Sequence, residues 1–295
     1  MNTIKYPKNF GMIEEKYSDY DKSKVVILPV PYGGTVSYGK GTEKGPSAII
    51  KASQHMELYD EELKKSSYKK RICTLQPLKS EKTPEKMLES IYNNTKQLIK
   101  DNKFIAMLGG EHSISSGLAK ALKEKYKDLS VLHLDAHADL RDRWYVGEEG
   151  RSQLSKYSHA CVMKRIREFV KKTIQIGIRS ISEEEIKEVK KSNIFWAKDI
   201  HNNEKWHSKA INSLSKNVFI TLDLDIFDPS IMSATGTPEP GGLNWYQVIN
   251  FLRKVFKSKN IVGMDIIELA PDSNKSCDFM AAKLAYKLIG YRLYL

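Results

Sequence analysis

The chain has 295 residues, of which 41% are hydrophobic and 28% are charged, as is ordinary for a soluble globular protein. No apolar run approaches the ~20 residues that span a bilayer, and the N-terminal MNTIKYPKNF lacks the apolar stretch of a signal peptide. Cys73, Cys161 and Cys277 are odd in number and widely spaced, which indicates free thiols in a reducing compartment. We therefore expect a cytoplasmic protein without a membrane partner.

The formal net charge of +12 raises the question of a nucleic-acid partner. However, the basic residues are spread along the chain, for example at 64–70, 164–172 and 257–259, and aromatic residues are not interleaved with them. This distribution is typical of a solvated, lysine-rich surface. We therefore expect no nucleic-acid partner.

Short apolar runs alternate with helical patterns along the whole chain. Strands are predicted at 24–30, 104–108, 129–135, 173–178, 193–197, 217–225 and 260–269. Helices are predicted at about 45–54, 84–101, 113–126, 159–171, 182–191, 204–215, 244–257 and 277–290. Strands that are apolar on both faces and separated by helices indicate a parallel sheet covered on both sides. Because no linker or repeat divides the chain, we predict a single three-layer α/β/α domain over residues 1–295.

Ionisable residues follow four of these predicted strands. In open α/β sheets, ligands bind beyond the carboxyl ends of the strands, so these residues should meet at one rim. Like charges a few Å apart cannot all stay ionised unless a cation lies between them. The rim therefore predicts a metal site. Its candidate residues are His112, Asp135, His137, Asp139, Asp223, Asp225 and Glu268.

The donor set suggests which metal would bind. Carboxylates mixed with imidazoles favour Mn²⁺ over Mg²⁺ or Fe²⁺, and the lack of a nearby cysteine argues against a structural zinc site. Six ligands fit two ions that share bridging carboxylates. A metal pair ~3.5–4 Å apart can activate a water molecule near neutral pH, which predicts a binuclear metallohydrolase.

Each residue taken alone also has an ordinary structural explanation. His112 could begin a helix, Asp223 and Asp225 could cap the turn before Asp228-Pro229, and Glu268 could pair with a lysine. Their coincidence at successive strand ends favours the metal site.

The other histidines are expected to lie outside the site. His55, His201 and His207 are predicted to be at the surface. His133 is predicted to point away from the Asp135 side, because neighbouring residues of a strand alternate between its faces.

Three motifs carry a resemblance to a known family. The segments GGEHS (109–113), DAHAD (135–139) and TLDLDIFDP (221–229), the last followed by GTPEPGG (236–242), resemble the signature motifs of the ureohydrolases, the arginase/agmatinase family. Further similar segments lie at 32–50, 158–165 and 264–271, so that the resemblance covers most of the chain. The agmatinase branch is the most similar.

The resemblance implies a role for each candidate residue. One Mn²⁺ would be held by His112, Asp135, Asp139 and Asp223, and a second by His137, Asp135, Asp223 and Asp225. His159 matches the family's proton-shuttling histidine, and Glu268 matches the glutamate that holds the guanidinium group of the substrate. The family fold is a three-layer α/β/α sandwich with a mainly parallel eight-stranded sheet. Family members are usually homo-oligomers, either trimers or hexamers.

The segment 140–160 bears on the choice of guanidino substrate. Arginases resemble one another here in an Asn- and Ser-containing segment ending in Gly-Asn-x-His-Gly, which this chain lacks, whereas Tyr157-Ser158-His159 is similar to agmatinases. We therefore expect hydrolysis of agmatine to putrescine and urea, a step of polyamine biosynthesis. The alternative substrates are aminopropylagmatine, guanidinobutyrate and arginine.

Charged side chains in the same segment leave the alternatives open. A substrate carboxylate could meet Arg141, Arg143 or Arg151, and a second amine could meet Asp142, Glu148 or Glu149.

Two other classes of protein compete with this interpretation. Metal-dependent deacetylases share the broad fold, but their typical site holds a single zinc ion beside two adjacent histidines. This sequence contains no His-His pair. A basic nucleic-acid-binding protein with structural carboxylates would instead show strongly salt-sensitive binding.

Overall fold

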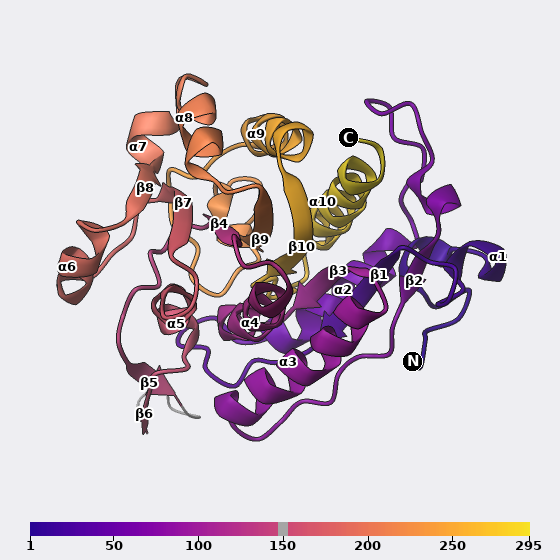
Figure 1. Cartoon of the computed structure of the whole chain (residues 1–295), viewed down its shortest axis with the longest axis horizontal. Coiled ribbons are helices and arrows are strands. Elements are labelled where there is room, and N and C mark those ends of the chain that lie inside the picture. The colour runs from indigo at the N-terminus through magenta and orange to yellow at the C-terminus, as the bar shows by residue number, and fades with distance from the viewer. Residues whose placement is uncertain (147–152) are drawn as a thin grey trace.

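A computed structural model describes residues 1–146 and 153–295, and these residues contain one large parallel sheet (Figure 1). The strand order is β2-β1-β3-β10-β9-β4-β7-β8, and every pairing is parallel. The strands are β1 (Val25–Val30), β2 (Ile72–Thr74), β3 (Phe104–Gly109), β4 (Ser130–Leu134), β7 (Lys172–Ile178), β8 (Asn193–Trp196), β9 (Asn217–Asp223) and β10 (Asn260–Ile267). The predicted eight-stranded, mainly parallel sheet is confirmed.

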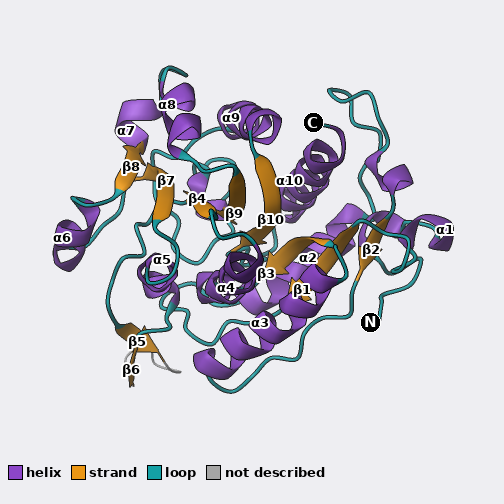
Figure 2. Cartoon of the chain, viewed as in Figure 1, coloured by secondary structure: helices purple, strands orange, loops and turns teal. Residues whose placement is uncertain are grey.

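Helices cover both faces of this sheet (Figure 2). Those longer than one turn are α2 (Gly45–Ser53), α3 (Pro84–Lys100), α4 (Ser115–Lys125), α5 (Val162–Arg167), α8 (Trp206–Ser213), α9 (Trp245–Ser258) and α10 (Lys275–Tyr294). The single-turn helices are α1 (Glu15–Ser18), α6 (Ile186–Val189) and α7 (Ala197–Ile200).

Two separate hydrophobic clusters fill the spaces between the three layers. Leu28 and Met107 pack with side chains of α3, α4 and α5, whereas their neighbours Ile27 and Leu108 pack with side chains of α2, α9 and α10. Successive strand residues therefore face opposite helix layers, which explains why the strand segments are apolar throughout.

Several elements differ from the prediction. The short strand β2 and the antiparallel pair β5 (Trp144–Val146) and β6 (Gln153–Ser155) were not predicted. The helix expected at 159–171 is a 3₁₀ turn at His159–Cys161 followed by the six-residue α5. The helix expected at 182–191 is likewise a 3₁₀ turn at Glu183–Glu185 followed by α6.

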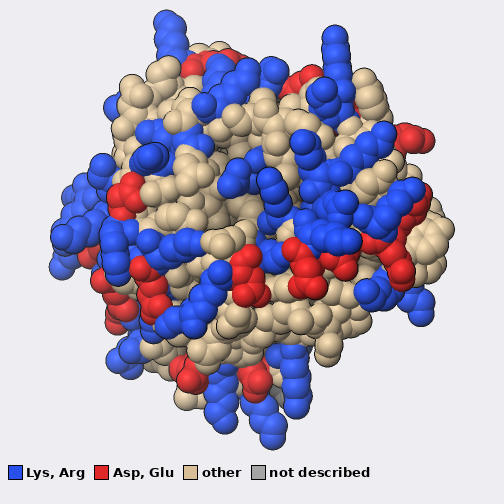
Figure 3. Space-filling model, turned by 45° about the vertical axis from the view of Figure 1, so that its right-hand side comes forward, with Lys and Arg blue, Asp and Glu red and all other residues tan. Residues whose placement is uncertain are grey.

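The distribution of surface charge and the state of the cysteines agree with the expectations from the sequence. Lysine and arginine side chains lie scattered among acidic ones on the face shown in Figure 3. Cys73, Cys161 and Cys277 are all free, as predicted, and all three are buried. Within the described ranges, no helix combines the length and the apolar character that crossing a membrane requires.

One histidine outside the predicted site was wrongly placed. His55 and His201 are exposed as predicted, but His207 is only 3% exposed. Its ring lies 5.2 Å from that of Phe251, and its Nδ1 lies 3.0 Å from the ammonium nitrogen of Lys254. It belongs to the packed interface between α8 and α9, because the buried face of α8 is wide enough to include it.

Candidate metal centre

The predicted site residues come from the carboxyl ends of the four central strands of the sheet. His112 begins a 3₁₀ turn after β3, Asp135 directly follows β4, Asp223 ends β9, and Glu268 directly follows β10. These strands are neighbours in the order β3-β10-β9-β4, so their ends lie side by side. The expected convergence at one rim is confirmed.

Backbone contacts hold the β3 end of the rim in place. A Cβ on Gly110 would lie 1.9 Å from the carbonyl oxygen of Tyr32, so only glycine allows this approach. Glu268 N–H donates to the Gly110 carbonyl at 2.7 Å, and the Glu268 carboxylate accepts from His112 N–H, also at 2.7 Å. These contacts connect the turns that follow β1, β3 and β10.

Two candidate residues have backbone conformations that residues other than glycine seldom adopt. Asp139 has φ 53° and Glu268 has φ 65°, both in the left-handed region. Such conformations cost of order 1–3 kcal/mol each and cluster at functional sites. The fold therefore places these two carboxylates at a cost in stability.

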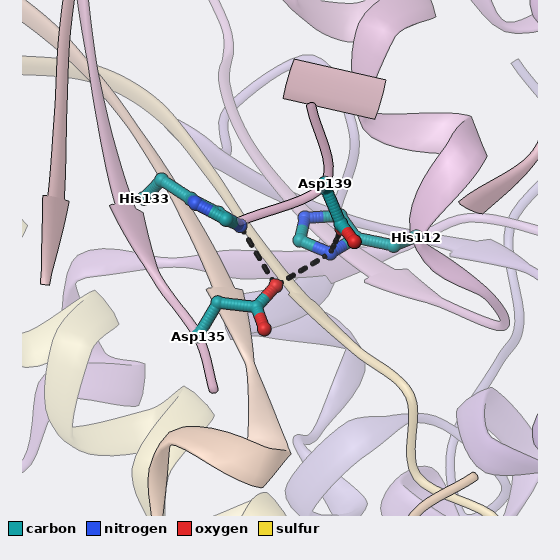
Figure 4. Close-up of side chains that lie close together, drawn as sticks. All are labelled: His112, His133, Asp135 and Asp139. Carbon is teal, nitrogen blue, oxygen red and sulfur yellow. Dashed lines mark hydrogen bonds and ion pairs between the residues drawn. The ribbon is translucent and has the colours of Figure 1, made fainter. Parts of the chain in front are cut away.

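Three carboxylates surround one nitrogen of His112. Its Nδ1 lies 3.0 Å from Asp135 Oδ2, 3.2 Å from Asp139 Oδ2 and 3.4 Å from Asp223 Oδ2. Figure 4 shows His112, Asp135 and Asp139 pointing toward one another. All four side chains are buried, so water cannot screen their charges.

A second group of donors lies on the other side of Asp135. His137 Nδ1 is 2.9 Å from Asp225 Oδ2 and 3.5 Å from Asp135 Oδ1. Asp225 is held in place by the N–H of Ala136, which donates to its other oxygen at 2.9 Å. Asp135 thus presents Oδ2 to His112 and Oδ1 to His137, an arrangement that suits a bridging carboxylate.

The hydrogen bonding of His112 tests whether this group suits a cation. Its Nε2 lies 2.9 Å from Thr221 Oγ1, whose hydroxyl is directed to Ser115 Oγ at 3.2 Å, so that Nε2–H donates to Thr221. Nδ1 is buried and has no hydrogen-bond partner among the residues described. In the neutral ring, the Nδ1 lone pair faces three carboxylate oxygens and is repelled unless a proton or a metal ion lies between them. These residues therefore fit a metal ion.

The raised pKa values of Asp223 and Asp139 also indicate a cation site. Burial, followed by the negative charges of Asp225 and Asp135, raises the pKa of Asp223 well above its usual range. Burial and then the charge of Asp135 also raise the pKa of Asp139. The ionised forms of Asp223 and Asp139 are therefore destabilised by burial and by their carboxylate neighbours, and a bound cation would relieve that repulsion.

Two groups of side chains are close enough to hold an ion. One consists of His112, His133, Asp135 and Asp139, and the other of Asp135, His137 and Asp225. Asp223 lies in neither group, although its Oδ2 is close to His112. The fold thus brings the six predicted ligands together, while the assignment of each ligand to an ion stays a prediction.

The predicted orientation of His133 was wrong. Its Nε2 lies 2.7 Å from Asp135 Oδ2, as Figure 4 shows, so the ring points toward Asp135. Residues two apart on a strand share a face, and this spacing separates positions 133 and 135. The alternation rule therefore places His133 on the Asp135 side.

His159 lines the same pocket. Its backbone N–H donates to Thr35 Oγ1 at 3.0 Å, and its Nδ1 lies 3.7 Å from Glu111 Oε2. Burial lowers the pKa of His159 to about 4, so its ring is neutral near neutral pH. The pocket is lined by His159 and Glu268 together with the predicted metal ligands His112, His137, Asp139, Asp223 and Asp225.

Two further residues of this site were not singled out from the sequence. The Thr35 hydroxyl donates to the buried carboxylate of Glu111, and both lie beside His159. Burial raises the pKa of Glu111 to about 7. The only signal was that both positions fall in segments that resemble the family.

Two arginines of the loop after Asp139 lie in the described part of the chain, and each is near a carboxylate. Arg141 pairs with Glu184 and stacks on Trp144, with its guanidinium carbon 3.9 Å from the ring centre. Arg143 lies 3.8 Å from Asp142. The other charged residues considered in this loop, Glu148, Glu149 and Arg151, lie outside the described residues.

Comparison with known proteins matches residues 23–290 to the model of the Arginase family. The chain belongs to the arginase family. An N(1)-aminopropylagmatine ureohydrolase of Synechocystis sp. is 40% identical, over 97% of this chain and 94% of that protein. An agmatinase of Pyrococcus horikoshii is 32% identical, over 94% and 93%. A crystal structure of agmatine ureohydrolase of Thermoplasma volcanium superposes with a TM-score of 0.85 at 29% identity, covering 98% of this chain and 95% of that one.

Family membership decides between the competing classes of protein. The chain is a ureohydrolase of the arginase family, an enzyme that acts on amidino groups, and this favours the ureohydrolase interpretation over the two competing ones. The buried His and Asp cluster is the part of the described structure that fits the metal dependence of this arginase-family enzyme.

Proposed function

We propose that this arginase-family enzyme hydrolyses the guanidino group of N(1)-aminopropylagmatine to urea and spermidine. The observation that carries the hydrolytic site is the shared carboxylate of Asp135, which presents one oxygen to the buried His112 and the other to the partly buried His137. Relatives that are 34–40% identical are named N(1)-aminopropylagmatine ureohydrolase, and this favours the longer substrate over agmatine, the substrate expected first from the sequence.

The cofactor in this proposal is a pair of manganese ions. His112, Asp135, Asp139 and Asp223 would hold one ion, and His137, Asp135, Asp223 and Asp225 the other. Such a pair supplies Lewis acidity and makes a water molecule nucleophilic near neutral pH. The carboxylate-rich donor set favours Mn²⁺ over zinc.

Glu268 is proposed to bind and orient the guanidinium. Carboxylates pair with this planar cation through parallel hydrogen bonds. Oε1 of Glu268 accepts from His112 N–H, and Oε2 lies 3.3 Å from the position that a Cβ on Gly236 would take. The glycine leaves space beside this carboxylate, and both residues line the pocket.

His159 is proposed to move the proton. The oxygen of water bonds to the guanidinium carbon, and the bond from that carbon to the substituted nitrogen then breaks. The leaving amine needs a proton, which water has released. A neutral imidazole that lines the pocket can accept that proton and donate it to the amine.

The charges around the pocket suit a cationic substrate. The carboxylates at its floor attract a guanidinium despite the positive net charge of the chain. Arg141, which lines the pocket, already has the Glu184 carboxylate as its partner, so it is not free to meet the α-carboxylate of arginine. We therefore expect arginine and guanidinobutyrate, which both carry a carboxylate, to be poor substrates.

Agmatine is the second candidate. An agmatinase is 32% identical over nearly the same length, and agmatine carries the same guanidino group on a shorter amine. In that case the products would be putrescine and urea.

A panel of four guanidino compounds tests the choice of substrate. With Mn²⁺ present, we expect kcat/KM for urea release to be highest for aminopropylagmatine and lower for agmatine. We expect it to be at least ~10²-fold lower for arginine and guanidinobutyrate, because a site rejects an end group of the wrong charge. A higher value for agmatine would overturn the order of the first two, and a higher value for arginine would overturn the specificity argument altogether.

We also propose a place and an assembly for the enzyme, on the resemblance to its family. It would act in the cytoplasm, in polyamine biosynthesis, as a single-domain subunit of a homo-oligomer. Light scattering after size-exclusion chromatography distinguishes a trimer or a hexamer from a monomer.

A further inference from the structure

We propose that His133 is a positioning residue that holds Asp135 through an Nε2–H proton fixed by Gln175, and that it is not a metal ligand. The inference rests on the proposed function, because Asp135 is the carboxylate proposed to bridge the two ions. His133 lies on β4 and Gln175 lies on β7, where the two are direct partners in the strand register. Both side chains are completely buried.

The orientation of the Gln175 amide follows from its contacts. Its Nε2 lies 2.8 Å from the Ala138 carbonyl oxygen and 3.0 Å from His133 Nδ1. A carbonyl oxygen can only accept, so the NH₂ end of the amide must face Ala138. The second N–H of the same group is then directed to His133 Nδ1.

This amide fixes the position of the proton on the imidazole ring. A ring nitrogen that accepts an N–H carries no proton of its own, so the proton of His133 lies on Nε2. Nε2 is 2.7 Å from Asp135 Oδ2, and the ring therefore donates a charge-assisted hydrogen bond to this carboxylate. Oδ2 is also the oxygen that lies nearest to His112 Nδ1.

A comparison with His112 explains why His133 is unsuited to be a ligand, although distance alone allows it. A histidine that binds a metal donates its other ring N–H to an acceptor. His112 fits this rule, because its Nε2 faces the Thr221 hydroxyl oxygen. The outer nitrogen of His133 instead faces an amide donor. His133 is therefore arranged to orient Asp135, whose other oxygen accepts from His137 N–H.

Metal affinity tests the role of the Gln175 amide. In Gln175→Leu, we expect Mn²⁺ binding, measured by electron paramagnetic resonance titration, to weaken by ~10–100-fold, the usual range for groups that support a ligand. Thr173→Val is the matched control, because Thr173 is buried two residues earlier on β7, and it should bind Mn²⁺ like the unsubstituted chain.

Substitutions of His133 itself separate a hydrogen-bond donor from a ligand. His133→Gln keeps an N–H near the position of Nε2 and should retain most of the Mn²⁺ affinity, whereas His133→Leu should lose affinity as Gln175→Leu does. Unchanged affinity in Gln175→Leu would overturn the proposal, as would failure of the unsubstituted chain to bind Mn²⁺.

Nitrogen-15 NMR of histidine-labelled protein reads the proton directly, with Zn²⁺ as a diamagnetic probe. The His133 signals are assigned by their loss in His133→Gln. We expect Nε2 of His133 to carry the ring proton in both the metal-free and the Zn²⁺-loaded protein. Loss of this proton when Zn²⁺ binds would show that His133 is a ligand. Neither measurement uses a guanidino compound, so an inactive but metal-binding protein would refute the proposed function and leave this inference standing.

Discussion

Asp135→Asn is expected to abolish tight Mn²⁺ binding and urea release together. Asp135 presents one oxygen to His112 and the other to His137, so the substitution removes negative charge from both proposed metal positions at once. The loss should exceed the ~10–100-fold effects typical of groups outside the ligand shell. Metal content by elemental analysis and urea release at saturating substrate are measured on the same preparation.

The matched control for this variant is Asp272→Asn. Asp272 lies at the surface beyond β10, where one carboxylate oxygen accepts from Asn274 N–H, and asparagine can keep that bond. We expect normal metal content and activity. Circular dichroism should give the same spectrum for both variants. An Asp135→Asn protein that retained two Mn²⁺ ions would exclude the bridging role.

His159→Ala is expected to lower kcat by ~10²–10⁴-fold, which is the usual contribution of a general acid or base. The imidazole lines the pocket and is neutral near neutral pH, so it can accept a proton and return it to the leaving amine. Metal content should not change, because the described contacts of the ring are with Thr35, Ser37, Ser158 and Glu111.

Two comparisons separate proton transfer from a structural effect at His159. His55→Ala removes an exposed histidine and should leave kcat unchanged. Free imidazole added to His159→Ala should restore part of the activity, since it can enter the space left by the ring. A variant with the kcat of the unsubstituted enzyme would remove His159 from the mechanism.

The positions of the central strands and their polar ends could be predicted from the sequence for one physical reason. Strands buried on both faces are apolar throughout, so the first ionisable residue marks the rim of the sheet, as Asp135 does after β4. The edge strand β2 gave no such signal, because it has only three residues and no motif follows it.

The contacts within the site could not be predicted in the same way. His159 meets Thr35 and Glu111 across the fold, and no local pattern encodes these long-range pairs. The orientation of His133 could have been derived, since it shares a strand face with position 135. Its partner Gln175 comes from the neighbouring strand and becomes visible only once the register is known.

The central claim is that the cluster of His112, Asp135, His137, Asp139, Asp223 and Asp225 holds two metal ions that the hydrolysis requires. Metal-free enzyme is titrated with Mn²⁺, and the ions bound per chain and the rate of urea release are measured on the same samples. The account predicts that the rate reaches its maximum only when two ions are bound per chain. Full activity with one ion per chain, or with none, would contradict it.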